Sequence, residues 1–207
     1  MSLHSYTVKP ENPENPEGLI IFLHGWGANC EDLTFLAPML KLPDYWFEFP
    51  EAPFPHPQVP GGRAWYALET QEYDGIEESR EKLIDWLHSI AKTTGIPPQR
   101  TILGGFSQGG AMTFDVGRTM GFAGLIVLSG YLHFKPEPQQ TPLPPILMAH
   151  GKQDMVVPLG AAHQARDSFQ KLGATVEYHE YNMGHEICPD ILGLIQSFVI
   201  KTLPNNH

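Results

Sequence analysis

Short, uninterrupted apolar runs alternate with amphipathic segments, and this alternation restricts the fold of the chain more than any other feature. The first run, Leu19–Leu23, is rich in branched residues and contains no polar position. Such a run is typical of a strand that is buried on both faces of a sheet. Similar runs predict further strands at Trp46–Phe49, Thr101–Leu103, Leu125–Leu128 and Ile146–Ala149. Thr175–Tyr181 alternates more, which predicts a last strand nearer an edge.

Helical periodicity fills the intervals between these strands. Apolar residues recur at helical spacing in Glu31–Leu40, Ile76–Ala91, Gly160–Leu172 and Ile187–Leu203. Buried strands that alternate with amphipathic helices indicate an α/β fold, with a mostly parallel central sheet and helices on both of its faces.

The length and composition favour one globular domain. The chain has 207 residues, enough for a single core. We therefore expect one domain over residues 1–207, with an extended or poorly ordered segment at 1–17. The Pro-rich stretch Pro50–Pro60 cannot be a central strand, and neither can Lys135–Pro145. We expect both to be surface loops, with residues 50–66 forming a loop or cap over the functional site.

The charge and the cysteines exclude several functional classes. A formal net charge of -10 argues against nucleic acid and anionic membrane surfaces as partners. The longest apolar run is too short to span a bilayer, and the polar N-terminal stretch does not resemble a signal peptide. The two cysteines, Cys30 and Cys188, define no disulfide framework. These features predict a cytoplasmic protein, and the sequence leaves its oligomeric state open, a homodimer included.

The segment Gly104–Ala111 is the clearest pointer to chemistry. It contains Gly-x-Ser-x-Gly, with Ser107 at the centre, directly after an apolar run and before a stretch that is compatible with a helix. This order is the context of a nucleophile elbow, in which glycines on either side make room for a strained serine. The N–H of Gln108 would then lie at a helix N-terminus, where negative charge is favoured. A Gly-rich tight turn with an incidental serine is the alternative.

A serine nucleophile needs a general base and an acid that orients it. In hydrolases with a nucleophile elbow, the order along the chain is serine, then Asp or Glu, then His. Asp154 and His185 follow in that order, and each lies just after a predicted strand. Functional groups gather at this edge of an open α/β sheet. His163 and His179 are the rival bases, but they fall within a predicted helix and a predicted strand.

The remaining polar groups complete the expected site. His24 and His150 each precede a glycine at a strand end, and we expect them to bind local backbone. The Trp26 N–H, in the loop after Leu23, is the second expected donor to an oxyanion beside the Gln108 N–H. No set of metal ligands and no nucleotide-binding glycine motif stands out, so we expect no metal and no cofactor.

The whole chain resembles the phospholipase/carboxylesterase and acyl-protein thioesterase family of small α/β-hydrolases. Ordered blocks carry the resemblance: Phe22–Gly27, Arg63–Tyr66, Gly104–Ala111, His150–Pro158 and Met183–Glu186. It implies an α/β-hydrolase fold and hydrolysis of esters or thioesters without a cofactor. It also implies Ser107 as nucleophile, Asp154 as acid and His185 as base, with Trp26 and Gln108 as oxyanion donors. The last block resembles bacterial carboxylesterases more than enzymes that depalmitoylate proteins.

From these features we predict a serine hydrolase that cleaves carboxylic esters of short to medium acyl chains. The small-molecule substrate is expected to bind near Phe54, Trp65, Met155 and Val156. The tryptophan that stands where leucine is common in the eukaryotic relatives, Trp26, is expected to limit the acyl pocket. Acyl-protein or acyl thioester hydrolysis is the alternative activity. A non-catalytic ligand-binding protein on a hydrolase fold is the alternative from another class.

Overall fold

The computed structural model describes residues 3–70 and 72–203, and a seven-stranded sheet forms its centre. The spatial order of the strands is β1-β3-β2-β6-β7-β8-β9. Their bounds are β1 Ser5–Val8, β2 Gly18–Leu23, β3 Tyr45–Pro50, β6 Thr101–Phe106, β7 Gly124–Leu128, β8 Ile146–Gly151 and β9 Val176–Tyr181. All neighbours pair in parallel except β1 and β3, which are antiparallel. The expected mostly parallel α/β architecture is therefore confirmed.

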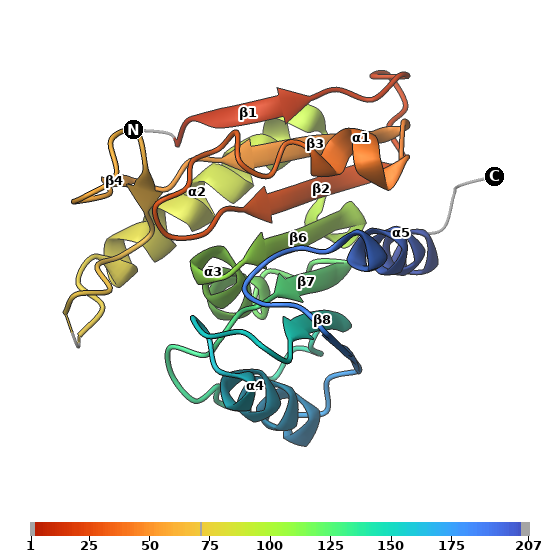
Figure 1. Cartoon of the computed structure of the whole chain (residues 1–207). Helices are drawn as coiled ribbons and strands as arrows, with labels where there is room; N and C mark the ends of the chain where they lie inside the picture. The colour runs from red at the N-terminus through yellow and green to blue at the C-terminus, as the bar shows by residue number, and fades with distance from the viewer. Residues whose placement is uncertain (1–2, 71, 204–207) are drawn as a thin grey trace.

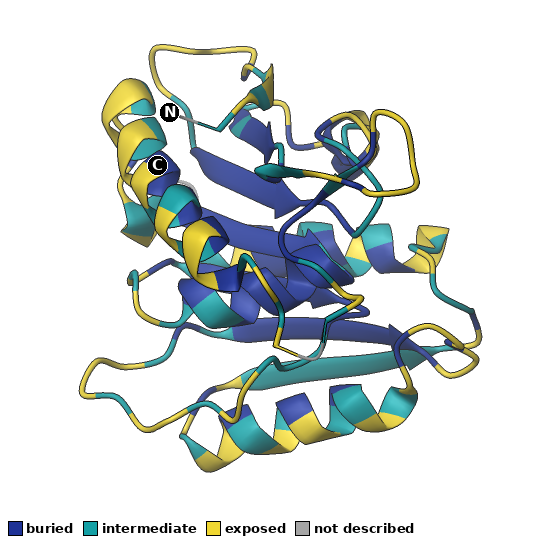
Figure 2. Cartoon of the chain, turned by 90° about the vertical axis from the view of Figure 1, so that its left-hand side faces the viewer, coloured by how far each residue is buried: buried dark blue, intermediate teal, exposed yellow. Residues whose placement is uncertain are grey.

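Helices cover both faces of the sheet (Figure 1). One face packs against α2 (Ile76–Thr94), α3 (Gln108–Gly117) and α4 (Leu159–Lys171), and the other against α1 (Leu36–Leu40) and α5 (Pro189–Thr202). Alternate residues of β2 divide between the two layers, with Leu19 and Ile21 on the first and Ile20 and Phe22 on the second. This division explains why the run is apolar throughout. Figure 2 shows the central strands dark blue and the edge strand β9 teal, between helices whose outer surfaces are exposed.

The two edges of the sheet come from segments near the two ends of the chain. Residues 1–17 were expected to be extended or poorly ordered, and of these Ser5–Val8 forms an extended edge strand, with Glu48 of β3 accepting hydrogen bonds from Ser5 and Thr7. Residues 1–2 and 204–207 of the expected single domain lie outside the described residues. At the other edge lies β9, as its alternating pattern predicted. No helix within residues 3–70 and 72–203 is long and apolar enough to cross a membrane.

The helix expected over Glu31–Leu40 is wrong for its first half. Only Leu36–Leu40 is helical, and the residues before it form turns in which Thr34 N–H donates to Glu31 O and Ala37 N–H to Thr34 O. Pro38 lies inside α1 but has no N–H for an i→i−4 bond to Thr34, so the α-helix does not extend toward the N-terminus from there. The other predicted helices agree to within a few residues at their ends.

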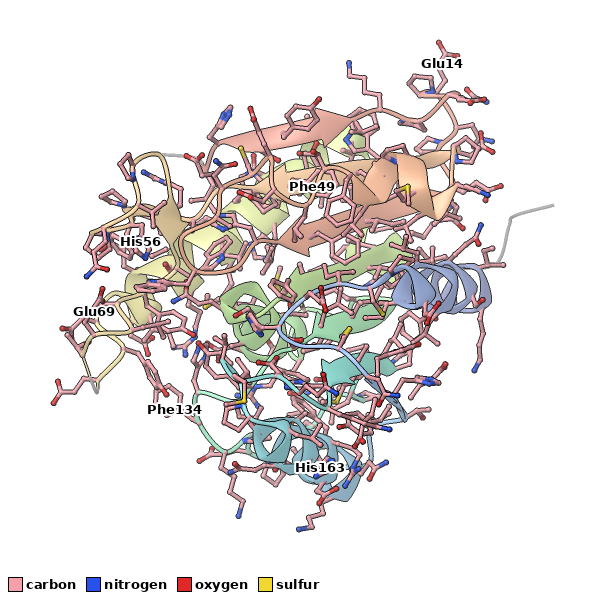
Figure 3. The ribbon with its side chains drawn as sticks, in the orientation of Figure 1. Glu14, Phe49, His56, Glu69, Phe134 and His163 are labelled. Carbon is pink, nitrogen blue, oxygen red and sulfur yellow. The ribbon has the colours of Figure 1, made fainter. Side chains whose placement is uncertain are left out.

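The C-terminal ends of the parallel strands all lie at one edge of the sheet, on the left in Figure 1. The segment after β3 returns over this edge as a short hairpin, β4 (Phe54–Pro55) and β5 (Arg63–Ala64). His56, Glu69 and Phe134 lie on the same side of the molecule in Figure 3, and His163 lies apart from them on α4. The 50–66 segment and the loop after β7 therefore both lie at this edge, and a cap formed by residues 50–66 stays a prediction.

Candidate active site

Ser107 occupies a sharp turn between β6 and α3, with φ 55° and ψ −117°. Its N–H donates to the carbonyl of Leu128 at 2.9 Å, which fixes the turn against β7. A Cβ on Gly109 would overlap the carbonyl of Leu23, and one on Gly105 would overlap the backbone of Gly109. Only glycine fits at both places, so the two glycines permit a backbone conformation that L-residues rarely adopt. This is the geometry of a nucleophile elbow.

Asp154 and His185 meet although 31 residues separate them. Asp154 lies in the turn after β8, and His185 follows β9 in the loop before α5. His185 Nδ1 lies 2.7 Å from Asp154 Oδ2. Because a carboxylate only accepts hydrogen bonds, Nδ1 carries the proton and Nε2 presents a lone pair. An imidazole held in this way can accept a proton at Nε2.

The Asp154 carboxylate is fixed from two sides. Its other oxygen, Oδ1, accepts the N–H of Val156 at 2.9 Å and that of Val157 at 2.8 Å. Burial alone would raise the pKa of Asp154, but the hydrogen bonds from His185 and from the two backbone N–H groups outweigh it and lower the pKa. Asp154 therefore remains an anion that orients the imidazole.

Ser107 and His185 line the same cavity, whose volume is about 320 Å³. The Phe106 ring lies 4.7 Å, centre to centre, from the imidazole of His185 and forms part of the wall. Further lining residues come from the loop after β2, the turns before α1 and the loop before α5: Gly25, Trp26, Ala28, Asp32, Leu33, Phe35, Glu186 and Ile187. A mostly apolar hollow with a serine and an imidazole inside it is suited to acyl transfer.

Both expected oxyanion donors border Ser107. A Cβ placed on Gly25 would lie 3.4 Å from Ser107 Cβ, so the loop that carries Trp26 abuts the serine. Within the described residues, the Trp26 N–H donates to no protein acceptor. Gln108 is the first residue of α3, and the first N–H groups of a helix have no intrahelical acceptor. Both N–H groups are therefore available to a developing negative charge.

The side chain of Gln108 has a role that the sequence did not indicate. Its Oε1 accepts the N–H of Trp65, and its Nε2 donates to the carbonyl of Tyr66, both at 2.9 Å. These bonds attach the segment after β5 to the start of α3. The sequence could not predict these bonds, because the partners of Gln108 lie more than forty residues away along the chain.

The structure brings only some of the expected substrate-binding residues to the site. Trp65 is fully buried, its Nε1 donates to the carbonyl of His24 at 3.0 Å, and it does not line the cavity at Ser107. Met155 is 92% exposed and Val156 67% exposed, and neither lines that cavity. The expectation of a contact with the acyl group assumed that large apolar residues in these loops face the serine. Here Trp65 faces the core, while Met155 and Val156 face solvent.

Phe54 lines a second, larger cavity of about 660 Å³ beneath the 50–66 segment. Trp26 lines this cavity as well as the one at Ser107, and it therefore stands between the two. Its ring packs edge-on against His56 with centroids 4.0 Å apart. Tyr66, Ala67 and two prolines add to the apolar part of the wall, and its charged part consists of Glu69, Asp74 and Glu78.

The four further histidines considered from the sequence, His24, His150, His163 and His179, bind backbone or surface carboxylates. The His24 ring contacts Gly25 O at 2.8 Å and accepts the Ala52 N–H at 3.0 Å, and burial lowers its pKa. His150 Nε2 lies 2.8 Å from Val157 O. The two rival bases pair elsewhere, His163 with Glu180 at 2.7 Å and His179 with Glu177 at 3.2 Å.

The cysteines and metal ligands offer no competing chemistry in the described part of the chain. Cys30 and Cys188 are free thiols, and burial raises the pKa of Cys30 to about 11. Across residues 3–70 and 72–203, no group of three or more His, Cys, Asp or Glu side chains is arranged to hold a metal ion.

Comparison with known proteins identifies the family of the chain. Residues 4–203 match the model of a family described as phospholipase/carboxylesterase. The acyl-protein thioesterase 1 of Saccharomyces cerevisiae is 31% identical, and the match covers 89% of this chain and 92% of the yeast protein. That of Neurospora crassa is 39% identical over 54% of this chain and 49% of its own length.

Solved structures extend the likeness to three dimensions. The crystal structure of esterase PE8 has 28% identity and a TM-score of 0.89, covering 98% of this chain and 100% of its own. The carboxylesterase of Bacillus cereus, at 15% identity and a TM-score of 0.81 over 97% of this chain and 94% of its own, supports the fold alone. The sheet order, the flanking helices and these matches confirm the α/β-hydrolase fold. This chain belongs to the phospholipase/carboxylesterase family, whose members include carboxylesterases and acyl-protein thioesterases.

Proposed function

We propose that this chain is a serine hydrolase that cleaves carboxylic esters of short to medium acyl chains through an acyl-enzyme intermediate. The observation that carries the proposal is the 2.7 Å contact between His185 Nδ1 and Asp154. It leaves His185 Nε2 as a proton acceptor in the cavity that Ser107 also lines. Nucleophile, base and orienting carboxylate are the parts that hydrolysis of an activated acyl group requires.

The reaction follows from these positions. Ser107 Oγ attacks the ester carbonyl carbon while its proton passes to His185 Nε2. The oxyanion accepts hydrogen bonds from the N–H groups of Trp26 and Gln108. The carbon–oxygen bond then breaks, and the alcohol leaves with the proton from His185. Water, deprotonated by His185, attacks the acyl-enzyme and releases the carboxylic acid and free Ser107.

The size of the cavity supports the chain-length part of the proposal. Its volume of about 320 Å³ is at the lower end of the range for small-molecule sites. Leu33, Phe35 and Ile187 give it apolar walls, and Trp26 closes one side. A short or medium acyl chain fits such a space, while a long chain would have to displace the Trp26 ring.

The test compares the p-nitrophenyl butyrate hydrolysis of wild type, Ser107→Ala and Ser197→Ala. Ser197 lies exposed on α5, remote from the cavity, and serves as the matched control. Members of a triad act as a unit, so Ser107→Ala should lower kcat by a factor on the order of 10⁴. Ser197→Ala should retain full activity. If folded Ser107→Ala kept a tenth of the wild-type kcat, the assignment of the nucleophile would be wrong.

A thioesterase activity is the second candidate, and the match to the yeast acyl-protein thioesterase favours it. The two activities separate on phenyl butyrate and S-phenyl thiobutyrate, which share an acyl chain. After correction for the rates of both compounds with hydroxide, our proposal expects the larger kcat/KM for the oxygen ester. The reverse order would favour the thioesterase. Absence of fluorophosphonate labelling would instead favour a non-catalytic binding protein.

A further inference from the structure

A third cavity, separate from the one at Ser107 and from the one lined by Phe54, lies between α2, α3, α4 and the loop after β7. Its volume is about 370 Å³, within the range of small-molecule sites. Arg80 and Ile84 of α2, Phe114 of α3 and Phe169 of α4 contribute to its wall. This cavity and the one at Ser107 have no lining residue in common.

His133 lines this third cavity, and its buried ring makes no hydrogen bonds. Its side chain is only 2% exposed, and neither ring nitrogen has a hydrogen-bond partner in the structure. Nδ1 lies 4.0 Å from Asp115 Oδ2, which is too long for a hydrogen bond. Four aromatic rings surround the imidazole, and none provides a hydrogen-bond partner for its nitrogens: Tyr66, Tyr73, Tyr131 and Phe134.

A buried imidazole without partners is unusual. A neutral imidazole always carries one N–H donor and one acceptor, and buried polar atoms are nearly always paired with protein, water or a ligand. Burial lowers the pKa of His133 to about 3, so the ring stays neutral in ordinary buffers. The ring is therefore a neutral donor and acceptor in the wall of a cavity that combines apolar residues with charged ones, and its nitrogens are covered by that wall.

Several cations line the cavity. Arg80 is occupied, because it donates to Asp115 at 2.7 and 3.0 Å and pairs with Glu77. Arg118 makes only a 3.3 Å bond to the carbonyl of Glu137, and Lys135 forms no ion pair within the described residues. The carboxylates of Asp115 and Glu137 also line the cavity, but only Asp115 pairs with a cation there, so Arg118 and Lys135 remain available to an anion.

We propose that this cavity is a second ligand site that binds a small amphipathic carboxylate. The apolar body of the ligand packs against Phe114 and Phe169. Its carboxylate meets Arg118 and Lys135, where charge-assisted hydrogen bonds are strongest. The wall now covers the ring nitrogens of His133, so the ligand displaces part of this wall, and the imidazole N–H then donates to the ligand and gains the partner that it otherwise lacks. The site lies outside the catalytic cavity and does not depend on the proposed reaction.

The experiment follows the ring nitrogens by ¹⁵N NMR in protein labelled at histidine, titrated with phenylacetate and with the neutral phenylacetamide. His133→Gln, which keeps a donor and an acceptor, assigns the signal of His133. We expect phenylacetate to move that signal saturably, with an affinity at least about tenfold higher than that of phenylacetamide, because only the carboxylate meets the two cations.

Two variants make the test specific. Arg118→Gln should weaken phenylacetate binding about tenfold, since it removes one cation at the cavity. Arg166→Gln is the matched control, because Arg166 lies on α4 outside the cavity and pairs with Asp167 at 2.8 Å. Three results would overturn the proposal: a His133 signal that does not move, equal affinity for both compounds, or equal loss in the two variants. Movement of the His185 signal alone would assign the binding to the catalytic cavity and would also refute it.

Discussion

Replacement of Trp26 by leucine should open the catalytic cavity toward its larger neighbour. The Trp26 side chain borders the 320 Å³ cavity at Ser107 and the 660 Å³ cavity beneath the 50–66 segment. Its Nε1 is buried without a hydrogen-bond partner in the structure, so the ring contributes no bond that leucine would lose. The backbone N–H at this position remains, and the expected oxyanion donor is retained.

The size of the effect can be worked from the burial of the acyl chain. Each methylene that passes from water into the enlarged apolar space contributes about 0.8 kcal/mol, which is a factor of about four in kcat/KM. Two additional methylenes should therefore raise kcat/KM about 15-fold for Trp26→Leu relative to wild type. On p-nitrophenyl acetate, which needs none of the new space, kcat should stay within about threefold because the backbone donor is unchanged.

The assay is kcat/KM on p-nitrophenyl esters from acetate to palmitate. Trp46→Leu is the matched control, since Trp46 lies on β3, donates to Glu48 at 2.9 Å and lines neither cavity. Its profile should follow that of wild type. Identical profiles for Trp26→Leu and wild type would refute the reasoning that this ring limits the acyl chain. Loss of kcat on every ester, in a folded protein, would mean that the ring holds the oxyanion loop in shape.

Further outcomes follow from individual side chains. Asp154→Asn should lower kcat about 10⁴-fold, because His185 would lose the acceptor that selects its tautomer. Steady-state assays measure this, with circular dichroism as the control for folding, and a kcat close to that of wild type would contradict it. Hydrogen bonds lower the pKa of Asp154 below its unfolded value of about 3.9, so the stability that the ionised carboxylate contributes is present above that pH and is lost as the pH falls. The urea midpoint of wild type should therefore fall more steeply than that of Asp154→Asn below about pH 4. Parallel curves for the two proteins would argue against this linkage. The pKa of His133 is about 3 in the folded protein, below the value of about 6.5 in the unfolded chain. Below about pH 6.5 the unfolded chain therefore binds a proton that folded His133 does not, and the free energy of unfolding falls by about 1.4 kcal/mol per pH unit on acidification. His133→Gln should be correspondingly less sensitive to acid in urea titrations between about pH 6 and 4.5, and an equal slope in the two proteins would show that His133 takes up a proton when folded. Gly109→Ala should yield little folded protein, because the new Cβ would overlap the Leu23 carbonyl, and normal yield and melting temperature would contradict the tight packing of the elbow.

The sequence predicted the sheet and the approach of Asp154 to His185 because both depend on local patterns. Apolar runs define buried strands, and groups that follow parallel strands are carried to one edge whatever the details of packing. Position after a strand also distinguished His185 from His163 on α4 and His179 on β9. Those two histidines pair with Glu180 and Glu177 of β9. The strained turn at Ser107 was readable because only glycine spacing of this kind permits it.

Contacts between distant loops could not be read in the same way. Trp65 carries no sequence signal that distinguishes a wall of the pocket from a core residue, and its bonds to His24 and Gln108 exist only in the folded chain. His133 was not singled out, because its isolation depends in part on Tyr66 and Tyr73, which are distant in the sequence. The helix expected to begin at Glu31 begins at Leu36 instead. The missing N–H of Pro38 has a larger effect on where the helix begins than the apolar periodicity does.

The central claim is that Ser107 becomes acylated. The most direct measurement is mass spectrometry of intact protein and of its peptides after exposure to a fluorophosphonate, with p-nitrophenyl butyrate hydrolysis followed in the same sample. The account expects one adduct per chain, on the peptide that contains Ser107, together with complete loss of hydrolysis, and no adduct on Ser107→Ala. An adduct on another residue, or hydrolysis that persists after full labelling of Ser107, would contradict it.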